Sequence, residues 1–143
     1  MKKTVLIASL MLAGAALAKA PTTRILVDGG GLKKTIEITS PAILQMSNVW
    51  FGRMFDEAKP ALTSAPPGGT RFRLQFFANF GRGEQKVYTL IYEPDPHGAG
   101  YLFLPKDDPN QGSILRHGRD GKWNYAAPQW ESLIKPVILR AAR

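Results

Sequence analysis

Ten residues near the middle of the chain alternate apolar and polar side chains more regularly than any other segment. Within residues 71–80 one set of alternate positions holds Phe72, Leu74, Phe76, Ala78 and Phe80, and the other set holds Arg71, Arg73, Gln75 and Asn79. Only Phe77 breaks the pattern. A period of two is typical of a β-strand with one buried face. The chain must therefore build a sheet that turns one face toward a core.

Other segments supply partners for this strand. Residues 23–27 and 35–39 are short β-like runs on either side of a glycine-rich turn at 28–31, which predicts a hairpin. After the turn at 81–84, residues 86–93 and then 100–104 are expected to run back and forth beside 71–80 as a meander. Residues 122–125 are a late strand, and Ile114-Leu115 is a brief one.

Two helices are expected, one on each side of this strand-rich middle. Ser40 followed by Pro41 places an N-cap hydroxyl and a first-turn proline before a short helix that extends through Ile43 and Leu44 to about Met46. Near the C-terminus the spacing of four apolar side chains predicts a helix that faces the core: Trp130, Leu133, Ile134 and Val137. Pro136 lies inside this stripe and is expected to kink or divide the helix.

These elements predict an α+β fold with a twisted antiparallel sheet and helices on one face. The alternative is a mainly β barrel or sandwich capped by the terminal helix. Residues 21–143 are expected to form a single domain, in which 48–57 pack across one end of the sheet. Residues 59–70 are rich in proline and glycine and are the best candidate for a mobile loop.

The first twenty residues have the three parts of a secretory signal peptide. Met1-Lys2-Lys3 is a cationic start, residues 5–18 are uncharged and mostly apolar, and 18–20 end the segment with small residues around one lysine. Fourteen residues span only about 21 Å as a helix, against a hydrocarbon core of about 30 Å. A permanent transmembrane anchor is therefore the less favoured reading, and a lipid anchor is excluded because the chain has no cysteine.

Cleavage after residue 20, or after residue 18 as the alternative, would remove basic residues and so lower the net charge of the protein. The formal charge of the whole chain is +8, but a chain cleaved after Ala20 has 16 basic and 11 acidic side chains and a charge of +5. This excess is spread over strands, turns and the C-terminal tail, so it predicts at most a weak attraction to an anionic envelope. We expect a monomeric, exported protein, periplasmic or extracellular, with no nucleic acid among its partners.

The sequence offers little for catalysis, metal binding or a cofactor. His97 lies near Asp95 and His117 near Asp120, but neither pair has the spacing of a shared metal site. Residues 108–112 fail as a calcium loop, because glycine arrives one place early and the bidentate glutamate is missing. No catalytic residue, metal or cofactor is therefore assigned, and a hydrolase with a His/Asp site remains only an alternative.

Binding residues can be sought among basic and aromatic side chains. Arg71 and Arg73 share the polar face of the central strand and suit an anionic partner, or else they form an ordinary solvated face. Tyr88 and Tyr92 share one face of the next strand, and among the many aromatics they have the best chance of exposure. Together with Trp50 they could stack on sugar rings, or else they fill the core.

Three segments, residues 92–105, 121–130 and 35–41, resemble an uncharacterised family of small exported bacterial proteins. Their most specific parts are Pro94-Asp95-Pro96 followed by Gly100-Tyr101, and Gly121-Lys122-Trp123. The resemblance covers about half of the mature chain and implies no known activity. In structural terms Gly100 relieves crowding where a strand starts, and Trp123 anchors the last strand under the terminal helix. Asp95 and His97 could form a polar site on the rigid turn between these motifs.

The sequence therefore predicts a non-enzymatic envelope protein that binds or scaffolds another envelope component or protein. Its contact surface is expected on the solvent face of the meander and on the turn at 94–97. A carbohydrate-binding module with exposed aromatic side chains is the first alternative. These expectations place the candidate binding residues at Asp95, His97, Tyr88, Tyr92, Arg71 and Arg73.

Overall fold

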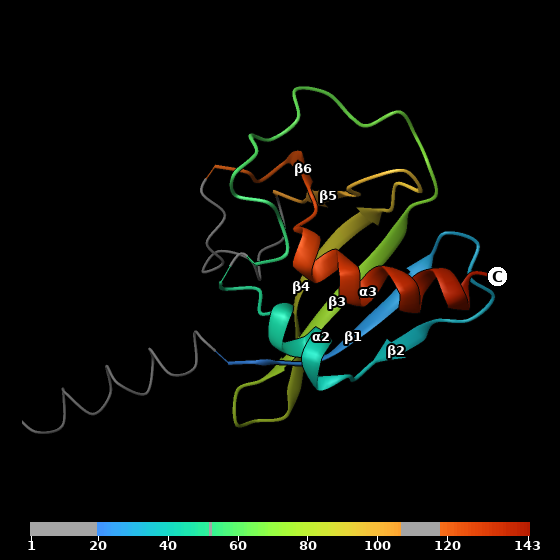
Figure 1. Cartoon of the computed structure of the whole chain (residues 1–143). Helices are drawn as coiled ribbons and strands as arrows, with labels where there is room; N and C mark the ends of the chain where they lie inside the picture. The colour runs from blue at the N-terminus through green and yellow to red at the C-terminus, as the bar shows by residue number, and fades with distance from the viewer. Residues whose placement is uncertain (1–19, 52, 107–117) are drawn as a thin grey trace, which may run out of the picture.

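Six strands form one open antiparallel sheet, and two helices lie against one face of it (Figure 1). The computed structural model describes residues 20–51, 53–106 and 118–143. The elements in chain order are β1 Thr22–Gly29, β2 Ile36–Ile38, α2 Pro41–Met46, β3 Phe72–Asn79, β4 Glu84–Glu93, β5 Tyr101–Leu104, β6 Lys122–Tyr125 and α3 Pro128–Ala141. In the sheet their order is β2-β1-β3-β4-β5-β6. Several expected features lie outside the described residues: the expected leader up to residue 19, the strand expected at 114–115, the segment 108–112 and His117.

The expected hairpin is confirmed, and it extends the sheet beyond β3. β1 and β2 pair with Ile25 opposite Ile38, and the turn between them uses glycines with φ of 81°, 58° and 78° at positions 29–31. Glycine adopts this left-handed region without the steric cost that other residues have. On its other side β1 pairs with β3, where Ile25 lies opposite Phe76. The sequence did not indicate this placement beside β3.

The meander is also confirmed, with one irregularity that explains the composition of β4. Phe76 pairs with Tyr88, but the next residue, Phe77, pairs with Lys86, so β4 has one extra residue at Val87. Such a bulge shifts the alternation of side chains by one position. Val87 and Tyr88 are therefore both buried although they are neighbours, and β4 is apolar at consecutive positions without being buried on both faces throughout.

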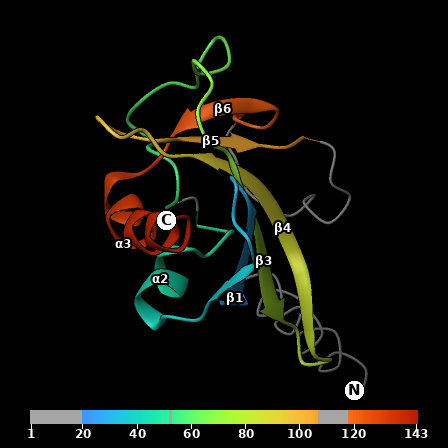
Figure 2. The same ribbon diagram turned by 90° about the vertical axis from the view of Figure 1, so that its right-hand side faces the viewer.

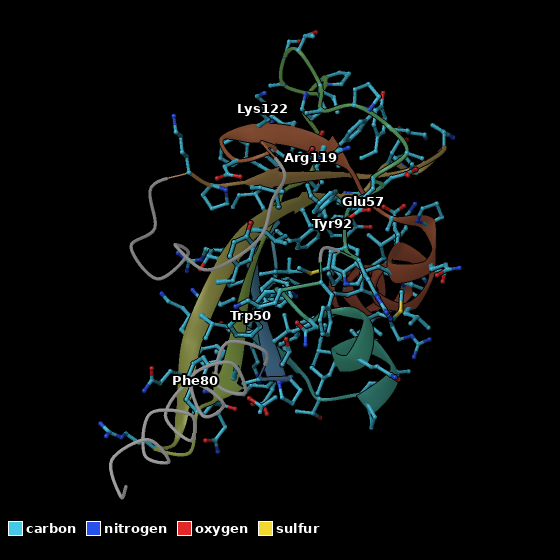
Figure 3. All side chains as sticks on the ribbon, turned by 90° about the vertical axis from the view of Figure 1, so that its left-hand side faces the viewer. Trp50, Glu57, Phe80, Tyr92, Arg119 and Lys122 are labelled. Atoms are coloured by element: carbon cyan, nitrogen blue, oxygen red, sulfur yellow. The ribbon has the colours of Figure 1, made fainter. Side chains whose placement is uncertain are left out.

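The core lies between the sheet and the two helices, which share one side of it (Figure 2). Trp130 of α3 is fully buried, and its ring meets Tyr92 of β4 edge-on, with centroids 5.5 Å apart. Tyr92 lies between the sheet and α3 (Figure 3). The Trp130 Nε1 donates to Ser47 Oγ at 2.9 Å, just after α2, so one side chain ties both helices to the sheet. Burial of such large aromatic surfaces is a main source of stability.

The α+β class is confirmed, while the barrel or sandwich alternative does not describe this open sheet. The strand arrangement was only partly predicted. Pro136 does not divide α3, which is one helix over Pro128–Ala141. Ser40 is at the N-cap of α2, but its hydroxyl makes no capping hydrogen bond. Within the described residues no helix has the length and apolar character needed to cross a membrane.

A segment between α2 and β3 lies along the outer edge of β6. Phe55 forms an isolated bridge with Ala126, and main-chain nitrogens of Asp56 and Leu62 donate to the carbonyls of Tyr125 and Trp123, each at 2.8 Å. Arg119 lies near Glu57 in Figure 3 and donates to its carbonyl oxygen at 3.1 Å. The segment that was expected to pack across one end of the sheet therefore covers an edge strand, which reduces exposed pairing groups.

Candidate functional site

Two tyrosines form an aromatic floor on the sheet face that the helices do not cover. Tyr101 of β5 and Tyr125 of β6 are cross-strand partners, and their ring centroids are 5.5 Å apart with planes inclined by 42°. Side chains alternate between faces along a strand, so both tyrosines lie opposite Leu102 and the other core residues of these strands. Both are only partly buried. Each therefore has ring surface that a ligand can reach.

The proline-rich segment forms a wall beside this floor. Residues 60–67 together with Tyr101 and Tyr125 line a cavity of about 490 Å³. Leu62 is fixed to β6 through its main-chain nitrogen, and Pro66 is buried. The segment predicted as a mobile loop is therefore tied at two points and gives the cavity a defined side.

Acidic side chains lie at one end of the floor. A second, smaller cavity of about 190 Å³ is lined by Glu93, Asp95, Pro67 and Tyr101, so Pro67 and Tyr101 belong to both cavities. We call the two cavities together the tyrosine groove: its floor is Tyr101 and Tyr125, its wall is residues 60–67, and its acidic end is residues 93–96. The groove therefore combines an aromatic floor with carboxylate groups at one end.

Charged groups set the hydrogen-bonding character of the groove. The buried Glu93 carboxylate accepts from Arg71 Nε at 2.8 Å, and the Arg71 guanidinium lies 4.7 Å from the ring centroid of Trp123. Lys59 Nζ lies 4.6 Å from the ring centroid of Tyr125. Burial, and then the negative charge of Asp95, raises the pKa of the Tyr101 hydroxyl. This hydroxyl is therefore a protonated donor at neutral pH.

The turn that forms the acidic end is fixed from behind by α3. The Gly100 nitrogen donates to both carboxylate oxygens of Glu131, at 3.0 Å and 2.8 Å. Lys135 Nζ donates to the Asp95 carbonyl oxygen at 2.6 Å and lies 3.6 Å from Glu131 Oε1. Charge-assisted hydrogen bonds of this kind are among the stronger ones in proteins. The helix therefore positions the turn while the opposite side of the turn faces the groove.

Glu131 should make stability depend on pH. Burial raises its pKa, and this effect is only partly opposed by the Gly100 nitrogen and by Lys135. An acid with a raised pKa in the folded state contributes stability that is fully present below its unfolded pKa of about 4.3 and is lost as the pH rises through the folded value. We expect the melting temperature of the wild type, relative to Glu131→Gln, to fall by a few degrees between about pH 4 and pH 7.

The measurement is a pair of thermal melts, followed by circular dichroism, at each pH. Ser132→Ala serves as the matched control because it changes an exposed position of the same helix without removing a titratable group, and its difference from the wild type should stay nearly constant. A constant difference for Glu131→Gln as well would show that the buried carboxylate does not titrate differently in the folded protein.

The structure brings two of the six predicted binding residues to the groove. Asp95 lines its acidic end, and Arg71 holds Glu93 there. Arg73 instead forms a two-pronged ion pair with Asp28, with Nη2 to Oδ2 at 2.9 Å, so its charge is neutralised on the sheet face. His97 is exposed, and the Asp95 carboxylate accepts from its main-chain nitrogen at 2.8 Å. The turn therefore uses this aspartate to fix its own backbone.

Tyr88 and Tyr92, which were given the best chance of exposure among the aromatic residues, are buried, so the core-filling alternative is confirmed for them. The two residues are 2% and 0% exposed, because they pair with Phe76 and Phe72 on the core side of β3, and Tyr92 also packs under α3. Trp50, the third expected stacking residue, is partly buried and meets Phe80 edge-on with centroids 6.1 Å apart. None of the three offers a free platform on the helix-free face.

Trp123 also differs from its expected place. It does not lie under the terminal helix; it pairs with Phe103 on the helix-free face, with ring centroids 5.4 Å apart. The aromatic side chains that do reach this face come from β5 and β6, and the sequence interpretation overlooked them as a pair. The Gly100-Tyr101 pair after a proline-rich turn was a signal that could have drawn attention to Tyr101. The register of β5 against β6 was still needed to place Tyr101 beside Tyr125.

Across the described part of the chain, no cluster of three or more histidine, aspartate or glutamate side chains is arranged to hold a metal ion. The sequence matches no family description, no curated protein and no solved structure. The resemblance to a family of small exported bacterial proteins therefore stays a prediction. The functional argument rests on the geometry of the tyrosine groove.

Proposed function

We propose that this protein is an exported, non-enzymatic binding module that holds a saccharide in the tyrosine groove. The observation that carries the proposal is the partly exposed pair Tyr101 and Tyr125, which forms the floor of a 490 Å³ cavity with a proline-rich wall. Aromatic side chains combine a broad apolar face with a polar tip, which suits the apolar faces and hydroxyl rims of sugar rings. The proposal thus assigns carbohydrate stacking to Tyr101 and Tyr125 instead of to Tyr88 and Tyr92.

The polar groups around the floor support a ligand rich in hydroxyl groups. The acidic end offers carboxylate oxygens of Asp95 and Glu93 as acceptors, and the Tyr101 hydroxyl is a donor beside them. Lys59 supplies a further donor near Tyr125. A ligand that both donates and accepts can satisfy this mixture, whereas a purely anionic ligand would be repelled at the acidic end.

The same contacts favour binding over hydrolysis. Glu93 is held in an ion pair with Arg71, and the Asp95 carboxylate is engaged by the backbone of its own turn. Carboxylates that are committed to positive or donor partners are poor candidates for the proton transfers of glycoside hydrolysis. The leader-like residues 1–20 and the surplus of positive charge support a location in the cell envelope, where saccharides are abundant.

Removal of a floor tyrosine is expected to weaken saccharide binding by about tenfold, since stacking on one ring contributes about 0.5–1.5 kcal/mol beyond burial. The protein is titrated with tetramers of N-acetylglucosamine and of glucose and with soluble peptidoglycan fragments. Binding is followed by calorimetry and by the total tryptophan fluorescence, which includes that of Trp123, linked to the groove through Arg71. Tyr101→Ala and Tyr125→Ala should each lose affinity, while Tyr125→Phe should retain most of it.

Phe51→Ala is the matched control, because this exposed aromatic side chain lines a different cavity beside α3. Its affinity should equal that of the wild type. If none of the three saccharide preparations binds, or if the Tyr101→Ala and Phe51→Ala proteins bind equally well, the tyrosine groove is not a saccharide site.

A further inference from the structure

The first residue of the described structure is already part of the core. Ala20 is 6% exposed and belongs to the buried cluster between the sheet and the helices. Two residues later Thr22 of β1 is 4% exposed, and its Oγ1 donates to the Ser47 carbonyl oxygen at 2.8 Å. Pro21 between them is exposed. The folded domain therefore includes residue 20, which is the residue after which the expected leader would end.

Two peptide bonds in this region have the small residues that a leader peptidase requires. Such an enzyme accepts only small side chains immediately before the bond that it hydrolyses and two positions earlier. Ala20 and Ala18 meet this requirement for the bond after residue 20, whereas Ala18 and Ala16 meet it for the bond after residue 18. The size of these side chains therefore does not distinguish between the two bonds.

The residue that follows each bond does distinguish between them. Pro21 follows Ala20, so the later bond is an amide of the proline nitrogen, which lies in a ring and has no hydrogen. A peptidase must bind the residue after the bond and protonate this nitrogen as the bond breaks, and the ring obstructs both steps. Lys19 follows Ala18, so the earlier bond is an ordinary secondary amide. The earlier bond is therefore the better substrate.

We propose that the leader is removed by hydrolysis of the bond between Ala18 and Lys19, so that the mature protein begins at Lys19. The proposal rests on the export that is part of the proposed function. The reaction consumes one water molecule. Its hydroxyl joins the Ala18 carbonyl carbon to form the carboxylate of the released leader, and its other proton passes to the Lys19 nitrogen, which becomes the new terminal amine. The catalyst is a leader peptidase of the exporting cell.

The core supports the earlier bond as well. Cleavage after residue 20 would remove Ala20 from the buried cluster and would place a charged terminal amine on Pro21, directly before the buried Thr22. Loss of buried apolar surface and a charge close to it both destabilise a fold. Cleavage after residue 18 keeps Ala20 in place and moves the new charge two residues further from Thr22. Because only Lys2 and Lys3 then leave with the leader, the mature chain has 17 basic and 11 acidic side chains and a formal charge of +6.

The N-terminus of the exported protein tests this assignment. The full chain is expressed in a bacterial host with a C-terminal affinity tag, and the envelope and the culture medium are separated from the cytoplasm. The tagged protein is then analysed by intact mass spectrometry and by N-terminal sequencing. We expect the exported protein to begin with Lys19, Ala20 and Pro21, and so to be two residues longer than the product of cleavage after Ala20.

Substitutions before and after the two bonds separate them. Ala16→Tyr places a large side chain in the pair that serves only the earlier bond, so the mature product should be lost and the full-length precursor should accumulate. Ala15→Tyr is the matched control, because it places the same side chain one residue away and outside both pairs, and it should be processed like the wild type. When Pro21→Ser is added to Ala16→Tyr, the ring after the later bond is gone, and processing should resume at that bond to give a chain that begins at position 21.

An exported wild-type protein that begins at Pro21 would overturn the assignment and leave the proposed export intact. Processing of Ala16→Tyr to the same extent as Ala15→Tyr would also overturn it. A full-length wild-type chain that stays in the cytoplasm would overturn both the assignment and the export on which it rests. Saccharide titration of the purified protein does not depend on which bond is cut, so the binding part of the proposed function is judged separately.

Discussion

Replacement of Gly100 by alanine is expected to lower the free energy of unfolding by about 3 kcal/mol, as for an overpacked core that also loses charged hydrogen bonds. A Cβ at this position would lie 2.6 Å from Glu131 Oε2, 2.9 Å from the Glu93 carbonyl oxygen and 2.9 Å from Tyr92 Cε2. None of these neighbours can retreat easily. The carbonyl belongs to the sheet, Tyr92 packs against Trp130, and Glu131 is held by the Gly100 nitrogen itself.

The nearby Gly98→Ala is the matched control, because a Cβ there meets no atom within 4 Å. Urea unfolding of the two variants, followed by circular dichroism, gives the comparison. Gly98→Ala should unfold within about 0.5 kcal/mol of the wild type. If Gly100→Ala is equally harmless, the contact between the turn and α3 is looser than these distances indicate. In the expected case saccharide binding should weaken as well, since the displaced turn forms the acidic end of the groove.

Trp130→Ala is expected to have the largest effect of any single substitution, a loss of about 3–5 kcal/mol. The indole is fully buried, meets Tyr92 edge-on and donates to Ser47 Oγ. Its removal leaves a cavity between β4 and both helices. Trp130→Phe keeps much of the apolar contact and loses the hydrogen bond, so it should lose only about 1–2 kcal/mol.

Urea unfolding by circular dichroism again provides the measurement, because fluorescence would change with the loss of a tryptophan. Leu133→Ala, on the exposed side of the same helix, should lie within about 0.5 kcal/mol of the wild type. A loss of less than 1 kcal/mol for Trp130→Ala would mean that α3 is not fixed to the sheet through this side chain.

The sequence predicted the strands and helices well where a periodic pattern was long. The alternation around Leu74 and Phe76 located β3 and its buried face. The apolar stripe near the C-terminus located α3, but its core side was only half right, because Trp130 and Ile134 are buried whereas Leu133 and Val137 are exposed. The crowding at Gly100 was also inferred correctly from the strand start that follows it. These features depend on residues that are close together in the sequence, so they can be recognised from one sequence.

The candidate site was harder to predict because it depends on register between distant segments. Tyr88 and Tyr92 share one face of β4, but their pairing with Phe76 and Phe72, on the core side of β3, decides which face this is. The pairing of Tyr101 with Tyr125 likewise depends on how β6 aligns with β5, twenty-four residues earlier in the chain. The side-chain pattern of one strand does not fix an alignment by itself, because the register also depends on the facing strand and on the turn between them.

The tyrosine groove also has a consequence for synthesis of the chain. During synthesis the residues of its wall are complete at position 67 and those of its acidic end at position 96. The floor also requires Tyr125, and the contact that supports the turn requires Lys135. A nascent or truncated chain that stops before α3 can therefore form strands without forming the groove. The proposed binding of a ligand therefore requires a chain that has been synthesised at least through residue 135.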